Sequence, residues 1–139
     1  MLVVLDTNVF LSALLAPQGM TAEIYKAWRP RRFEVATCTE QIEELRRASR
    51  YPKFRAALQP HRFGRLINNL TRARVYREAL PKLLTAEDPS DSFLLNLAAV
   101  SNADYLVTGD KRSGILELSA IGRTRILTVR AFCETVLSI

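Results

Sequence analysis

Histidine, cysteine and long apolar runs are scarce in this chain of 139 residues. The one histidine, His61, lies in an arginine-rich segment with no accompanying nucleophile motif, which argues against a Ser–His–Asp triad. The two cysteines, Cys38 and Cys133, lack metal-ligand spacing and are typical of free thiols in a reducing cytosol, with a single disulfide as the alternative. No run reaches the ~18 apolar residues of a membrane span, and the apolar N-terminus lacks the basic region of a signal peptide. We therefore expect a cytoplasmic protein with no membrane partner.

Glycine and lysine are also few. Gly109 and Gly114, two of the five glycines, fit neither P-loop nor dinucleotide-binding spacing, which argues against both kinds of site. The basic residues comprise sixteen arginines and four lysines, and the formal net charge is +6. The planar guanidinium group matches phosphate, so this surplus favours a nucleic-acid partner, with a generic basic surface as the other interpretation.

Short apolar runs alternate with segments of helical periodicity. The runs predict strands over residues 2–5, 33–36, 75–76, 105–108 and 125–127. The periodicity predicts helices over 7–15, 21–30, 38–49, 88–101 and 129–138, with two shorter helical stretches between residues 51 and 77. Thr37, three residues before Glu40, has capping-box spacing. The alternation predicts one α/β domain over residues 1–139, a three-layer α/β/α sandwich around a mostly parallel sheet of about four to five strands.

Four carboxylates occupy positions that such a fold brings together. Asp6 directly follows one predicted strand, and Asp110 comes after another, with Gly109 between. Asp91 lies in the first turn of a predicted helix, and Glu44 lies on the helix after the second strand. Ligands of open parallel sheets bind beyond the carboxyl ends of the strands. We therefore expect the four acids to converge on one cleft.

Carboxylates that converge repel one another, so either a cation lies among them or one is protonated. Oxygen ligands with no neighbouring histidine or cysteine suit Mg²⁺ or Mn²⁺ better than Zn²⁺. These cations polarise phosphoryl oxygens and generate hydroxide from bound water. The acidic set therefore predicts phosphodiester hydrolysis, with arginines binding the phosphate backbone.

Each acid also has an ordinary structural interpretation. Asp6 can cap the helix that follows it, and Asp110 can be a turn residue. Asp91 can complement a helix dipole, and Glu44 can belong to a solvated acidic helix face. The placement of Asp6 and Asp110 at two strand ends favours the cation site.

Four stretches of the chain resemble motifs of the PIN domain family. LVVLDTNVFLSALL resembles its opening strand and Asp-Thr-Asn motif, and TEQIEELRR resembles its second acidic motif. EDPSDSFLLNLAAVSNADYLVTGDK resembles the third and fourth motifs, and with the closing RILTVRAFCETVL the resemblance covers nearly the whole chain. The nearest subgroup is that of toxin components of toxin–antitoxin systems.

The resemblance implies a metal-dependent endoribonuclease of the VapC type. Such proteins act on RNA, form homodimers and are held inactive by a cognate antitoxin that fills the acidic groove. The implied ligands of Mg²⁺ or Mn²⁺ are Asp6, Asp91, Asp110 and, directly or through water, Glu44, with Asn8 and Thr108 as the polar groups that orient them.

One residue departs from the family pattern and keeps a second hypothesis open. Relatives often have another acid two residues after the Asp110 equivalent, whereas this chain has Arg112. That positive charge argues against a tightly held second metal, and it is compatible with phosphate binding or with a degenerate site. The alternative is thus a non-enzymatic RNA-binding or regulatory protein. The basic residues near Glu44 that are candidates for RNA contact are Arg46, Arg47, Arg50, Lys53 and Arg55, with a solvated helix face as the ordinary interpretation for most of them.

A remote third hypothesis is a phosphatase of the haloacid-dehalogenase type. That chemistry also begins with a buried strand ending in aspartate, and it needs a second aspartate two residues later as general acid. Asn8 stands at that position and cannot donate a proton in that way.

Overall fold

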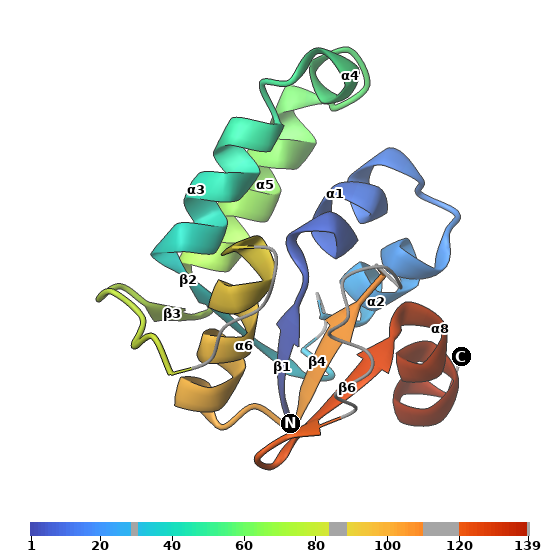
Figure 1. Cartoon of the computed structure of the whole chain (residues 1–139). Helices are drawn as coiled ribbons and strands as arrows, with labels where there is room; N and C mark the ends of the chain where they lie inside the picture. The colour runs from blue at the N-terminus through green and yellow to red at the C-terminus, as the bar shows by residue number, and fades with distance from the viewer. Residues whose placement is uncertain (29–30, 84–88, 110–119, 139) are drawn as a thin grey trace.

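A six-stranded sheet forms the centre of the molecule, with strand order β3-β2-β1-β4-β6-β5 (Figure 1). The computed structural model describes residues 1–28, 31–83, 89–109 and 120–138. Neighbouring strands pair in parallel except β5 and β6, which pair antiparallel. The strands are β1 (Leu2–Leu5), β2 (Glu34–Cys38), β3 (Arg74–Tyr76), β4 (Tyr105–Thr108), β5 (Ala120–Ile121) and β6 (Thr124–Thr128).

The predicted α/β class and mostly parallel sheet are confirmed, with six strands in place of the expected four to five. The extra strand, β5, has two residues, and a run that short gives no periodic signal in the sequence. All five predicted strands are present, and their bounds lie within two residues of those expected.

The apolar residues of β1 are buried because helices cover both faces of the sheet. Val3 and Leu5 belong to the core on one face, beneath α1 (Thr7–Leu15), α2 (Met20–Trp28) and their neighbours. Leu2 and Val4 belong to the core on the other face, beneath α6 (Pro89–Ser101). The alternation of side chains along β1 thus divides them between two cores, as expected for a strand inside a three-layer sandwich.

Three further helices in the described part of the chain belong to the face that α1 and α2 cover. Apolar residues of α3 (Thr39–Ala48), α5 (Pro60–Thr71) and η1 (Phe132–Leu137) share its core. The short helix α4 (Pro52–Arg55) joins α3 to α5, and these three form an arm that projects beyond the carboxyl ends of the strands (Figure 1). The last predicted helix is confirmed as α8 (Val129–Ala131) continuing into the π-helical η1.

One helix start differs from its prediction. The N-cap of α3 is Cys38, which makes no side-chain capping bond, and the hydroxyl of Thr37 instead donates to Oε1 of Gln41 at 2.6 Å. Thr37 is buried within β2, so its hydroxyl bonds to a side chain of the next helix rather than to the amides of a helix end. The capping box predicted from Thr37 and Glu40 is therefore wrong.

The connection from α6 to β4 is a tight helix ending. The backbone N–H of Ala103 donates to the carbonyl of Ala98 at 3.2 Å, and that of Asn102 donates to Ala99 at 3.3 Å. Asn102 has φ of 53°, so this is the left-handed ending that usually takes glycine or asparagine. No helix within the described part of the chain is both long and apolar enough to cross a membrane.

Candidate functional site

Three adjacent parallel strands end at one edge of the sheet, which we call the carboxyl edge. Asp6 follows the central strand β1, and it is also the residue from which α1 begins. On one side, β4 ends at Thr108, and on the other, β2 leads through Cys38 into α3. The predicted meeting of strand ends is therefore present in the fold.

The carboxylate of Asp6 is buried and receives hydrogen bonds from both strand and helix. The backbone N–H of Asn8 donates to its Oδ1 at 3.2 Å, and the hydroxyl of Thr108 donates to its Oδ2 at 3.0 Å. The backbone N–H of Asp6 donates to the carbonyl of Val107 at 2.9 Å. Asp6 is therefore an N-cap, as the ordinary interpretation held, and is also fixed by the neighbouring strand.

The two polar residues expected to orient the acids contribute in different ways. Thr108 is fully buried and acts through its side-chain hydroxyl. Asn8 acts through its backbone amide, while the residue itself is exposed at the start of α1. The side chain of Asn8 is thus presented to the solvent beside Asp6.

A buried glutamine, which the sequence interpretation missed, ties α3 to the end of β1. Nε2 of Gln41 donates to the carbonyl of Leu5 at 2.6 Å, while its Oε1 accepts from Thr37. Gln41 lies on the same helix face as Leu45 and Ala48, which are buried. The spacing of four and three residues between Gln41, Leu45 and Ala48 is the sequence signal that Gln41 lies on the buried face of the helix. Its effect is to hold α3 against the residue that precedes Asp6.

The three glutamates of α3 differ in their surroundings. Glu43 is exposed, and Oε2 of Glu40 accepts from the backbone N–H of Leu80 at 3.4 Å. Glu44 is half-buried, one turn after Gln41. Burial raises the pKa of the Cys38 thiol to about 12, and the charges of Glu40 and Glu44 add to the effect. Glu44 thus lies in the second turn of the helix that begins at the end of β2.

The other two predicted acids, Asp91 and Asp110, are located by their positions relative to α6 and β4. Asp91 is in the first turn of α6, and its side chain lies outside what the structure describes. Asp104, just after α6, bonds through its backbone and carboxylate to Leu2 at the opposite edge of the sheet. The first turn of α6 is therefore directed toward the carboxyl edge. Asp110 comes two residues after Thr108, the last residue of β4, and it lies, with Arg112, outside the described residues.

The donor chemistry at this edge fits a hard divalent cation. Asp6 and Glu44 offer carboxylate oxygens. His61, the one histidine of the chain, belongs to α5 and not to the segments that follow β1, β2 or β4. Among the side chains that the structure describes, no three potential ligands come together, and two of the four predicted acids are not in that set. Oxygen-only donors suit Mg²⁺ or Mn²⁺.

Basic side chains gather on the projecting arm. A cavity of about 550 Å³ lies between α3, α4 and α5, and three of the five predicted RNA-contact residues line it, namely Arg46, Arg50 and Arg55. Apolar residues, including Phe63 and Ile67, form much of the rest of its wall. The arm thus carries a cationic and partly apolar hollow on the helix that also carries Glu44.

Comparison with known proteins identifies the fold. Residues 2–112 match the PIN domain family. The chain belongs to this family. A comparison with curated proteins finds no significant sequence match.

The PIN domain also resembles a solved structure. A chain of the crystal structure of VapBC2 from Rickettsia felis, bound to a DNA fragment from their promoter, aligns with a TM-score of 0.60 and 16% sequence identity. The alignment covers 92% of this chain and 98% of that one. At this identity the likeness concerns the fold alone.

Proposed function

We propose that this PIN domain is a metal-dependent endoribonuclease that hydrolyses phosphodiester bonds of RNA. The observation that carries the proposal is the buried carboxylate of Asp6 at the carboxyl edge, held by Thr108 and by the start of α1. The chain has a net charge of +6, and its basic side chains suit the binding of a polyanionic substrate. The acidic edge suits a metal ion at which that substrate is cut.

In the proposed site, Asp6, Glu44, Asp91 and Asp110 hold Mg²⁺ or Mn²⁺. When bound, such a cation supplies Lewis-acid polarisation of the phosphoryl group and an activated water. Thr108 and the Asn8 amide hold the Asp6 carboxylate in one orientation, and Gln41 holds the helix that carries Glu44. A rigid set of ligands costs less reorganisation when the charged substrate binds.

RNA contacts are proposed for the arm. Arg46, Arg50 and Arg55 surround one cavity, and an arginine can bind phosphate through two parallel hydrogen bonds. Because α3 carries both Arg46 and Glu44, an RNA strand bound at the arm cavity would contact the same helix that provides a proposed metal ligand.

The proposed biological role is that of the toxin of a toxin–antitoxin pair, acting in the cytoplasm as a homodimer and inhibited by an antitoxin. The family membership and the likeness to a VapBC2 chain support this role. The second candidate is a PIN protein that binds RNA without cutting it, which Arg112 favours by placing a positive charge two residues after Asp110.

The test is cleavage of labelled single-stranded and structured RNA by the purified chain with Mg²⁺ or Mn²⁺. We expect cleavage that chelation, Asp6→Asn or Glu44→Gln abolishes, and Glu43→Gln is the matched control because Glu43 is exposed on the same helix. Cleavage that survives chelation and Asp6→Asn would exclude the metal mechanism. Binding of RNA with no cleavage under any metal condition would favour the second candidate.

A further inference from the structure

One face of α5 carries a row of cationic and amide side chains. Arg62, Arg65, Asn69 and Arg72 follow one another at spacings of three and four residues, which places them along one side of the helix. They line two hollows, of about 90 Å³ and 170 Å³, and Arg65 belongs to both. The two hollows therefore form one continuous surface, which we call the α2–α5 cleft.

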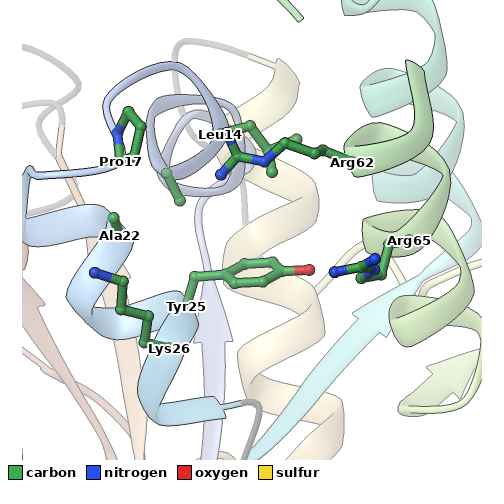
Figure 2. Close-up of a pocket in the computed structure, with 8 residues that line it drawn as sticks. Leu14, Pro17, Ala22, Tyr25, Lys26, Arg62 and Arg65 are labelled. Carbon is green, nitrogen blue, oxygen red and sulfur yellow. The ribbon is translucent and has the colours of Figure 1, made fainter. Parts of the chain in front are cut away.

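The opposite wall of the cleft comes from α2 and the residues after it. Tyr25 and Lys26 line the smaller hollow, and Trp28 and Arg31 line the larger one. Figure 2 shows the ring of Tyr25 extending from α2 toward Arg65, while the guanidinium of Arg62 reaches over toward Leu14 of α1. Two arginines of α5 thus approach the tyrosine hydroxyl and the end of α1.

Positive charge dominates this cleft. Among the described residues that line it, five are basic and none is acidic; the five are Lys26, Arg31, Arg62, Arg65 and Arg72. Of these five, Lys26 makes an exposed ion pair, in which its Nζ lies 3.5 Å from Oε1 of Glu23. Such a concentration of one sign creates a local potential that attracts polyanions.

Tyr25 is held in a position from which it can donate a hydrogen bond. Nδ2 of Asn69 donates to the Tyr25 hydroxyl at 3.1 Å, and the ring packs edge-on against Trp28 with centroids 5.7 Å apart. Because the hydroxyl oxygen is the acceptor in that bond, its own proton is available for an anionic oxygen. The cleft thus presents a neutral donor directed toward Arg65 (Figure 2).

We infer that the α2–α5 cleft binds the phosphate backbone of a single RNA strand, as a contact additional to the arm cavity lined by Arg46, Arg50 and Arg55. Each hollow is smaller than the roughly 300–1,000 Å³ of a typical small-molecule pocket, so it suits a phosphate group rather than an enclosed ligand. Phosphates repeat along a strand as the cations repeat along α5. The inference rests on the proposed RNA substrate and is independent of whether the RNA is cut.

The test measures binding of a fluorescein-labelled 20-nucleotide single-stranded RNA by the full chain carrying Asp6→Asn, which prevents proposed cleavage and retains a capping side chain. The variant Arg62→Gln/Arg65→Gln is compared with Arg123→Gln/Arg125→Gln, which removes the same charge at the opposite edge of the sheet. We expect the cleft variant to bind about 5- to 30-fold more weakly in 0.1 M salt. The slope of log K against log salt should fall by about 1.4 for two lost phosphate contacts, with the control nearly unchanged.

Four results would overturn the inference. Equal losses in both double variants would mean that only net charge matters, and no RNA binding at all would remove its basis. Equal affinity for a poly-glutamate peptide of the same charge, with the same dependence on Arg62 and Arg65, would assign the cleft to an acidic protein. RNA binding that depends on the cleft but is never followed by cleavage would refute the proposed nuclease and leave this inference standing. Undiminished RNA binding by the cleft variant, together with normal cleavage by the unmodified chain, would overturn this inference and leave the proposed nuclease standing.

Discussion

The hydroxyl of Thr108, the last residue of β4, lies 3.0 Å from Oδ2 of Asp6, the residue that follows β1. The two residues are 102 positions apart in the chain and are brought together because β1 and β4 are parallel neighbours. The bond therefore joins the ends of two strands and also fixes the orientation of the Asp6 carboxylate, the proposed metal ligand.

Replacing Thr108 by valine tests whether this bond orients the carboxylate. The valine keeps the shape but removes the hydroxyl that donates to Oδ2 of Asp6, so we expect the Mg²⁺ concentration for half-maximal RNA cleavage to rise about 10- to 100-fold. The variant should also lose about 1–3 kcal/mol of unfolding free energy, since a buried hydrogen bond to a charged group is removed. Thr108→Ser, which retains the hydroxyl, should restore the metal dependence. A valine variant with unchanged metal dependence would show that Thr108 acts on stability alone.

Replacing Gln41 by leucine tests the link between α3 and β1. It leaves the Leu5 carbonyl and the Thr37 hydroxyl buried without their partner, so we expect a loss of about 2–4 kcal/mol in urea unfolding. The double variant Thr37→Val/Gln41→Leu should lose less than the sum of the single losses, because Thr37 and Gln41 share one bond. Additive losses would contradict the network.

The ending of α6 predicts a contrast at Asn102. Its φ of 53° is costly for alanine and easy for glycine, so Asn102→Ala should lower the free energy of unfolding by about 1 kcal/mol. Asn102→Gly should leave it nearly unchanged. Thermal unfolding of the three proteins in parallel measures the difference, and equal midpoints for alanine and glycine would refute the assignment.

The thiol of Cys38 predicts a pH dependence of stability in alkali. Its pKa is raised to about 12 in the folded state from an ordinary value near 9.0, so the unfolded chain loses this proton at lower pH than the folded chain. The stabilisation is complete below pH 9 and is lost as pH rises from there toward 12. Between pH 9 and 10 the contribution falls by about 1 kcal/mol. Urea unfolding of Cys38→Ala should show a shallower decline over this range than the unmodified chain, and identical slopes would contradict the shift.

The meeting of strand ends at the carboxyl edge could be predicted from the sequence, because apolar runs mark where the strands end. Asp6 and Thr108 follow or end apolar runs, and right-handed parallel connections bring such ends to one edge. Gln41 was missed because a glutamine among glutamates looks solvated, although its spacing from Leu45 and Ala48 marks a buried face. Thr37 was misassigned because capping-box spacing carries no information on whether the hydroxyl faces a helix end or a core. The convergence of Asp91 and Asp110 with Asp6 stays a prediction.

The order of the strands has a consequence for self-association. Within the described residues, the two margins of the sheet are β3, with three residues, and β5, with two. Strands so short offer few unpaired backbone groups, so they are poor templates for adding a strand from another chain. A continuous sheet running through two subunits is therefore disfavoured. The proposed homodimer should be joined through helical surfaces, with each sheet ending inside its own subunit.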